Sequence, residues 1–249
     1  MSAGLSSAYD APFAAAFIVH AAAAFLGVAN VPTLSYWTLS DIFEEPGFTS
    51  EAWAETFGIQ TKFGVPKPAY RALQLLRTLP KTGLPVSAPG AAPRRGGLGP
   101  AGGCTATVGT VDVITAADAS QGTTVRLAAL VTNFNSNIGN AENATAGLPI
   151  TTAAGLTLAF ANLPAGAAVA PAATLTVLNS TAGWAKPVWI AAGQPRYPSA
   201  AEIADEMAAS QPAVLQLPTR KGAGANDVAV DLPPLEPYAV AYLTIDYAL

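Results

Sequence analysis

The sequence predicts a chain of two structural parts, an α/β part at about residues 1–82 and an all-β part at about residues 104–249. The first observation is a change of pattern, from two helical segments flanking one apolar run to a series of short alternating runs. The second is the stretch 83–103, in which Pro and Gly dominate and no period survives, as in a linker. The third is composition: 51% of the 249 residues are apolar and 11% are charged, which suits a packed core rather than disorder.

The α/β part begins with the most apolar stretch of the chain, residues 11–28. Asp10 and Pro12 suit the start of a helix, with Asp near the N-cap and Pro in the first turn. The length also fits a membrane span or a signal peptide. However, no positive charge precedes the stretch and His20 interrupts its middle. The sequence therefore favours a buried helix, in which His20 is an ordinary helical side chain without a catalytic role.

A strand-like segment and a second helix follow. Residues 31–39, VPTLSYWTL, are rich in β-branched and aromatic residues and predict a buried strand. Residues 67–80 predict a helix that begins at Pro68 and ends at Pro80, with its apolar side chains largely on one face. One strand and two helices form an α/β layer that is too small to close a sheet alone.

The all-β part shows alternating runs separated by Gly, Pro and Asn, which is typical of a β-sandwich. The predicted strands are 105–115, 124–132, 156–160, 174–178, 228–232 and 239–245. Residues 199–210 interrupt them with a short helix, in which Ser199 is the expected N-cap and Glu202 its capping-box partner. We expect this part to fold without the α/β part.

Charge and the rarest residues exclude several classes of function. The net charge is −4, from 12 basic and 16 acidic residues, and no basic cluster exceeds the pair Arg94 and Arg95, so a nucleic-acid partner is not expected. A single cysteine, Cys104, excludes an internal disulfide and a cysteine-based zinc site. The single histidine excludes a multi-histidine metal site and disfavours a Ser-His-Asp triad. No metal and no cofactor are predicted.

The candidate site lies where the predicted strand ends, because function collects at the carboxyl ends of strands in parallel α/β barrels. Tyr36 and Trp37 supply aromatic faces for the C–H surface of a sugar ring, and Glu44 and Glu45 supply carboxylates that accept hydrogen bonds from its hydroxyls. The residues alone leave a second interpretation open, in which Trp37 belongs to the core and the acids to a solvated loop.

Several motifs resemble one enzyme family. SYWTLSDIFEEPG (35–47) resembles the last barrel strand of family 39 glycoside hydrolases, which are β-xylosidases and α-L-iduronidases. FGIQTKFGVPKPAYRALQLLRTL (57–79) is similar to the following loop and final barrel helix, and SSAYDAPFAAAFIVHAA (6–22) to the helix before that strand. Residues 181–211 and 232–245 resemble the family's accessory sandwich. The resemblance implies the C-terminal remnant of a (β/α)8 barrel at 1–82 followed by a β-sandwich at 104–249.

The resemblance also implies where the chemistry is missing. The family uses a retaining mechanism with two glutamates, which such enzymes hold about 5–5.5 Å apart. One belongs to an Asn-Glu pair, and the other precedes the position that matches Asp10. This chain has no Asn-Glu dipeptide and no Glu before Glu44. We therefore expect it to correspond to the C-terminal third of such an enzyme, with no catalytic residue and no activity of its own; adjacent Glu44 and Glu45 are poor substitutes because neighbouring strand residues point to opposite faces.

The resemblance implies that the terminal sugar is contacted by Tyr36, Trp37, Glu44 and Glu45. Asp41 is expected to have a structural role. The acids Glu44 and Glu45 favour the xylosidase branch of the family, and no Arg follows the motif closely to bind a substrate carboxylate, so a β-xyloside is the expected substrate. The alternative is a non-catalytic carbohydrate-binding or structural sandwich protein. A third interpretation makes residues 11–28 a membrane anchor, although no membrane partner is expected.

The sequence does not indicate a compartment. The sequons at Asn143 and Asn179 would matter only in a secreted protein.

Overall fold

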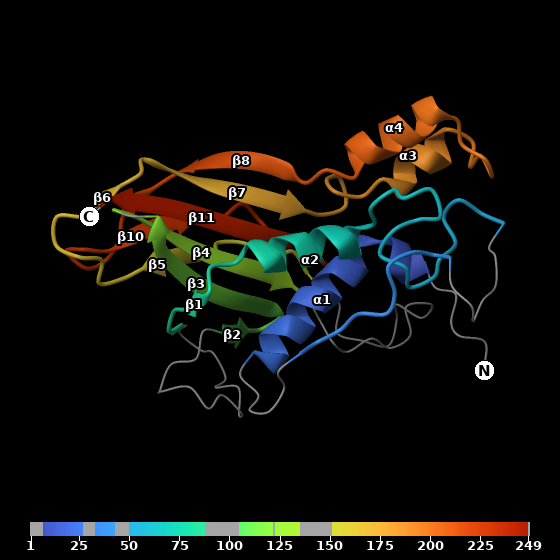
Figure 1. The fold of residues 1–249 in the computed structure, drawn as a ribbon. Coiled ribbons are helices and arrows are strands. Elements are labelled where there is room, and N and C mark those ends of the chain that lie inside the picture. The colour runs from blue at the N-terminus through green and yellow to red at the C-terminus, as the bar shows by residue number, and fades with distance from the viewer. Residues whose placement is uncertain are drawn as a thin grey trace.

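The computed structural model describes residues 7–26, 33–42, 50–87, 105–121, 123–134 and 151–248, with the side chains of 119–121 left out. In these ranges the chain forms a mixed, sheet-rich fold with few helices (Figure 1). The helices are a 3-10 helix at Ser7–Asp10, α1 (Pro12–Phe25), α2 (Pro68–Thr78), α3 (Lys186–Ala191) and α4 (Ala200–Ala209). The strands are β1 (Thr82–Gly83), β2 (Thr105–Val108), β3 (Val111–Gln121), β4 (Thr124–Asn133), β5 (Thr157–Phe160), β6 (Ala168–Val169), β7 (Ala172–Leu178), β8 (Ala213–Pro218), β9 (Arg220–Lys221), β10 (Val228–Asp231) and β11 (Val240–Ala248).

Two antiparallel sheets organise these strands. The larger has the order β1-β3-β4-β11-β7-β8, with β2 paired to β3 and β6 to β11. The smaller has the order β5-β10-β9. The central pair of the large sheet is β4 and β11, whose register runs from Val240 opposite Thr132 to Ala248 opposite Thr124. The strand latest in the described sequence therefore lies in the middle of the sheet.

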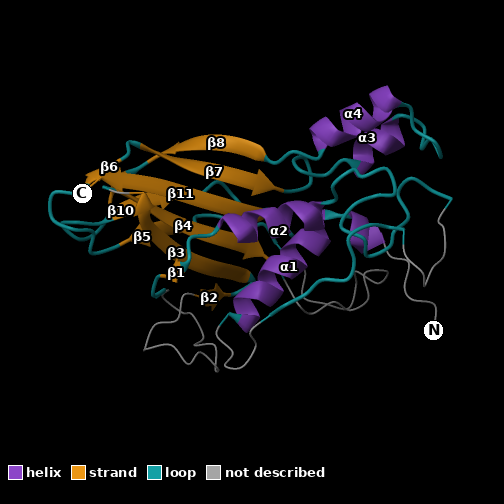
Figure 2. Cartoon of the chain, in the orientation of Figure 1, coloured by secondary structure: helices purple, strands orange, loops and turns teal. Residues whose placement is uncertain are grey.

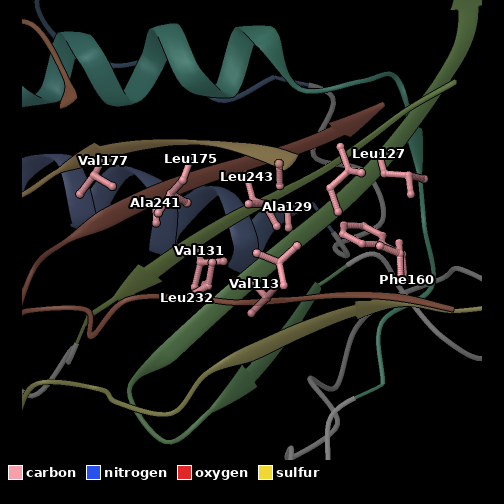
Figure 3. Packing of buried hydrophobic residues seen from close by; sticks show 14 of the residues in the cluster. Val113, Leu127, Ala129, Val131, Phe160, Leu175, Val177, Leu232, Ala241 and Leu243 are labelled. Atoms are coloured by element: carbon pink, nitrogen blue, oxygen red, sulfur yellow. The ribbon is translucent and has the colours of Figure 1, made fainter. Parts of the chain in front are cut away.

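The middle of the large sheet is buried on both faces, as alternate residues of β4 show, whereas the edge strand β8 is largely exposed. Leu127, Ala129 and Val131 point into one cluster, which includes Phe160 of β5 and Val230 of β10 (Figure 3). The intervening Ala128 and Leu130 belong to a second cluster on the opposite face. A strand covered on both sides has no polar alternation, which explains why β4 is a nearly continuous apolar run.

The second cluster joins the two parts of the sequence. α1 and α2 lie side by side across that face of the sheet (Figures 1 and 2). Their small side chains, such as Ala15 and Ala72, are fully buried together with Leu130 of β4 and Val240 of β11. The sheet is therefore covered by helices that come from the other part of the chain. The independent folding expected for residues 104–249 stays a prediction, and this shared core is the feature that a truncation would test.

A buried polar contact adds to that packing. His20 of α1 lies with its Nδ1 2.6 Å from Oδ2 of Asp112 on β3, a carboxyl that is 1% exposed. Thr107 of β2 donates to the other oxygen of Asp112 at 2.6 Å. The ring of His20 also packs against Phe134 at a centroid distance of 4.7 Å. His20 is thus a helical side chain, as expected, but one that pairs with the sheet.

The predicted helices are present. Pro12 and Pro68 occupy the first turns of α1 and α2. The N-cap of α1 is Ala11, however, and Asp10 lies one residue earlier in a buried position. In α4 the predicted capping box is confirmed, with Ser199 accepting from the backbone of Glu202 and Glu202 accepting from that of Ser199.

The strand predictions for the all-β part hold in β4, β5, β7, β10 and β11, whereas the run 105–115 is the hairpin β2–β3. The turn of that hairpin contains Gly109 at a φ of +60°. The short strands β1, β6 and β9, the strand β8 and the helix α3 were not predicted.

The buried strand predicted at 31–39 is wrong for its described residues, 33–39. The segment 33–42 makes only a single parallel bridge, between Ser40 and Gln60. Leu34, Trp37 and Leu39 are 55%, 65% and 63% exposed, because no described element packs over them. No helix in the described ranges is long and apolar enough to cross a bilayer.

Candidate functional site

The predicted aromatic residues occupy different environments. Trp37 is 65% exposed, so much of its side chain is available to solvent. Tyr36 is half-buried and packs against the cluster that α1 and α2 form. Burial, and after it Tyr9 and Asp41, raise the pKa of Tyr36 to about 12, so its phenol stays protonated. Of the predicted sugar-binding residues, Glu44 and Glu45 lie outside the described residues.

Backbone hydrogen bonds hold the segment that carries these aromatics. The amide of Ile59 donates to the carbonyl of Thr38 at 2.9 Å, and the amide of Asp41 donates to the carbonyl of Gln60 at 3.0 Å. Gly58 directly precedes Ile59, and a Cβ there would collide with the backbone of Ser40 and Asp41. The loop after the segment therefore packs against it closely enough to require glycine.

Asp41 is anchored in a fully buried ion pair. The Nζ of Lys67, at the N-cap of α2, lies 2.7 Å from Oδ1 of Asp41, and both side chains are 0% exposed. Thr56 donates its hydroxyl to the same oxygen at 2.6 Å. Burial raises the pKa of Asp41 and outweighs the lowering by Lys67 and Thr56. Paired with Lys67 and fully buried, Asp41 fixes the segment and is not exposed to a substrate.

Asp10 extends this pair into a network. Its Oδ1 lies 2.7 Å from the same Lys67 Nζ, an ion-pair distance without hydrogen-bond alignment. Its Oδ2 lies 3.0 Å from Nζ of Lys186 on α3 and accepts the backbone amide of Glu55 at 3.1 Å. Lys186 also lies 3.0 Å from Oε1 of Glu55. We call these five residues, Asp41, Lys67, Asp10, Lys186 and Glu55, the ion network.

Sequence reasoning missed most of the ion network. Asp10 was predicted to lie near the N-cap of a helix, which is a usual place for an Asp before an apolar helix. Nothing local marks Lys67 or Lys186 as buried, because lysine is ordinarily exposed. Both lysines precede a proline that begins a helix, and that Lys-Pro repeat at 67–68 and 186–187 is the one signal the sequence offers.

The loop 50–66 also contacts the C-terminal part. Trp53 is 2% exposed and donates its Nε1 to Oε2 of Glu206 on α4 at 2.9 Å. It packs in a third cluster with Val65 and with Ala185 and Trp189, which lie before and within α3. Figure 1 shows this loop beside α3 and α4, at the end of the large sheet. The base of the site is therefore built by both parts of the chain.

The arrangement offers an exposed aromatic face on a rigid base. Nothing among the described residues groups three or more His, Cys, Asp or Glu side chains as a metal site would. The carboxyl nearest Trp37 in sequence, Asp41, is buried and paired. What the described geometry can do is place an indole against a ligand with an apolar face, such as a sugar ring.

Comparison with known proteins gives a consistent family. The model of the family "Glycosyl hydrolases family 39" matches residues 3–225. A β-xylosidase of Caldicellulosiruptor saccharolyticus is 42% identical over 73 residues, which are 28% of this chain and 14% of that protein.

Solved structures agree in fold. The GH39 enzyme of Xanthomonas axonopodis pv. citri superposes with a TM-score of 0.65 and 23% identity over 96% of this chain. A monomeric β-xylosidase of Caulobacter crescentus CB15 superposes with a TM-score of 0.59 and 18% identity, also over 96%. The chain spans 42% of the length of each of these two structures. The family match covers most of the residues whose fold and contacts are described above, and the chain belongs to family 39 of the glycosyl hydrolases.

Proposed function

We propose that this chain is the part of a retaining β-xylosidase that supplies the last barrel strand, the final barrel helix and the accessory β-sandwich. The barrel part is 1–82, the linker is 83–103 and the sandwich is 104–249. In this proposal the chain binds the terminal sugar of the substrate, and the two catalytic glutamates are not among its residues. The β-xylosidases among its relatives support the choice of a xyloside.

The single observation that carries the proposal is the exposure of Trp37. An indole that is 65% exposed contributes little to folding, yet this one lies on a segment held by a ladder to residues 57–60 and by the buried Asp41. Rigid support for an exposed aromatic ring is what a sugar subsite needs, since the ring of a pyranose packs on a fixed flat face. Tyr36, Glu44 and Glu45 are proposed to complete the subsite, with the two acids accepting hydrogen bonds from sugar hydroxyls.

The buried acids of this chain do not suit the two catalytic roles that the reaction requires. A retaining enzyme needs one carboxylic acid to protonate the leaving oxygen and one carboxylate to attack the anomeric carbon. Asp41 and Asp10 are buried and paired with lysines, so neither has access to a sugar. Glu206 is 2% exposed and bonded to Trp53. These acids are therefore structural in the proposal.

Two measurements with 4-nitrophenyl β-D-xyloside test it. The chain of 249 residues is expected to release no nitrophenol even at high protein concentration. A longer protein, in which this chain follows the preceding part of a family 39 enzyme, is expected to hydrolyse the xyloside. In that protein Trp37→Ala and Glu44→Ala should each lower kcat/KM at least tenfold, about 1.4 kcal/mol.

Tyr197→Ala is the control, because Tyr197 is an aromatic side chain that is 76% exposed outside the proposed subsite. Turnover by the 249-residue chain that disappears with Glu44→Gln would place the catalysis in this chain and contradict the proposal. A completed protein that binds xylo-oligosaccharides without hydrolysing them would support the non-catalytic carbohydrate-binding alternative instead.

A further inference from the structure

The four buried charges of the ion network balance only when Lys186, from the C-terminal part, is counted. Asp10, Lys67 and Asp41 are each 0% exposed, and together they carry a net charge of −1 if all three are ionised. Lys186, with a side chain 11% exposed, brings the four buried groups to neutrality. A buried charge without a partner is strongly unfavourable in a protein interior, so the balance matters for folding.

No other described cation balances that charge. Lys67 already lies 2.7 Å from both aspartates, so its one positive charge is shared. The other titratable groups near the aspartates are Glu55, which is acidic and 43% exposed, and the phenol of Tyr36, which interacts with Asp41 and with Tyr9. The uncharged Thr56 donates a hydrogen bond but no charge. Oδ2 of Asp41 has no hydrogen-bond partner among the described residues.

Lys186 reaches the network from far along the sequence. It lies 176 residues from Asp10 and 131 from Glu55, on the first turn of α3. Burial by itself lowers the pKa of Lys186, but the carboxylates of Asp10 and Glu55 together raise it, so the ammonium stays charged. Asp10 also receives the amide of Glu55, so the same carboxyl is held by the loop and by α3.

We infer that Lys186 is the counter-ion that makes burial of the Asp10–Lys67–Asp41 group possible, and that the segment carrying Trp37 is held in place only when α3 has docked. The inference does not rest on the proposed glycosidase activity. In this inference the C-terminal part stabilises the first part. Lys186 supplies one positive charge to the buried group of Asp10, Lys67 and Asp41, which is negative without it.

The first test is Lys186→Met, which keeps the length of the side chain and removes its charge. In the 249-residue chain the variant is expected to lower the midpoint of thermal unfolding by about 10 °C at pH 7.5. Without Lys186 a buried carboxyl acquires a raised pKa in the folded state, so the folded variant binds a proton that the unfolded one lacks. The deficit relative to the wild type should therefore shrink as the pH falls from 7.5 towards about 4.

The matched control is Lys221→Met, because Lys221 is an exposed lysine on β9. It should change the midpoint by less than about 2 °C at either pH. A Lys186→Met deficit that stays constant between pH 7.5 and pH 5 would show that the loss comes from packing, and it would overturn the inference.

The second test restores the balance in another way. Asp10→Asn removes one negative charge, so the double variant Asp10→Asn/Lys186→Met leaves Lys67 and Asp41 as a neutral pair. The double variant is expected to be more stable at pH 7.5 than Lys186→Met alone. If the double variant instead loses as much stability as the two single variants together, the inference is contradicted. If Lys186→Met does not fold at pH 7.5, the added Asp10→Asn must recover a cooperative transition, and failure to do so overturns the proposal equally.

Discussion

Arg71 of α2 holds Ser210 at the C-terminus of α4 through two hydrogen bonds, 139 positions apart in the sequence. Its Nε donates to the backbone carbonyl of Ser210 at 2.8 Å, and a terminal nitrogen donates to the hydroxyl at 2.8 Å. Ser210 is the C-cap residue of α4 and is 0% exposed. A cation at the C-terminus of a helix also favours the helix dipole. The ion network and this contact are two buried polar links between the helical regions of the first part of the chain and helices α3 and α4 of the C-terminal part.

Removing this link should destabilise the whole fold. Arg71→Met is expected to lower the free energy of unfolding by about 2–3 kcal/mol, because it leaves a buried carbonyl and a buried hydroxyl with fewer partners. Urea denaturation followed by circular dichroism measures the change. Arg77→Met, at an exposed position of the same helix, is the control and should change stability by less than about 0.5 kcal/mol. Equal losses in the two variants would show that the contact with Ser210 is not what stabilises the fold.

Two tryptophans should respond in opposite ways to truncation. Trp37→Ala is expected to leave the free energy of unfolding within about 0.5 kcal/mol of the wild type, because the indole is 65% exposed. Trp53→Ala should cost about 3–5 kcal/mol, since that indole is 2% exposed and bonded to Glu206. Both values come from urea denaturation of the 249-residue chain. A large loss in Trp37→Ala would mean that Trp37 is a core residue, the interpretation that competes with sugar binding.

Two glutamates of α4 should give pH effects of opposite sign. Burial raises the pKa of Glu206, which is 2% exposed, although the hydrogen bond from Trp53 lowers it in part and Glu202 adds to the rise. A raised folded-state pKa means that ionisation destabilises the fold as the pH rises above about 4.3, the ordinary value for Glu. Glu206→Gln is therefore expected to stabilise the protein at pH 8, and the gain should vanish towards pH 4.

Glu202 is the matched counterpart, because hydrogen bonds from the backbone and side chain of Ser199 lower its pKa. Its contribution is present above the ordinary pKa and is lost as the pH falls through the lowered one. Glu202→Gln should therefore destabilise at pH 8 and have no effect at low pH. Thermal unfolding of both variants across pH 4–8 measures the two trends, and a common sign would contradict the burial of Glu206.

The shared core predicts that the all-β part is unstable by itself. Residues 105–249 produced alone would expose the sheet face that α1 and α2 cover, including Leu130, Val240 and the ring of Tyr242. An exposed apolar face of this kind promotes association. Size-exclusion chromatography should show aggregates for 105–249 and a monodisperse complex when 1–87 is co-expressed. A monodisperse, cooperatively unfolding 105–249 would restore the expectation of independent folding.

The sequence predicted elements well where their determinants are local. Pro68 at the start of α2 and the capping box of Ser199 with Glu202 depend only on neighbouring residues, and both are present. The strand predicted at 31–39 failed because β-branched and aromatic composition does not show whether a neighbouring strand exists to bury it. Trp37 shares the pattern of a core residue and is exposed instead.

The site was predictable only in part for the same reason. Tyr36 and Trp37 are adjacent in the sequence and could be identified from the motif. Lys67 and Lys186 belong to the buried base beneath the same segment, but their burial results from partners 26 to 176 positions away. Nothing in the composition around Lys186 indicates that its charge is needed beside Asp10. Such contacts become visible only when the two parts of the chain are placed together.

The position of β11 bears on how the chain is made. The central seam of the large sheet pairs β11 with β4, more than 100 residues earlier, so its contact order is high and its folding intrinsically slow. During synthesis β3 and β4 emerge long before the strand that separates β4 from β7. Until β11 emerges, β4 lacks its neighbouring strand on that side. A premature stop shortly before residue 240 would therefore remove the middle of the sheet rather than its edge, and the nascent protein would be a substrate for chaperones or proteases rather than a slightly shortened version of the native fold.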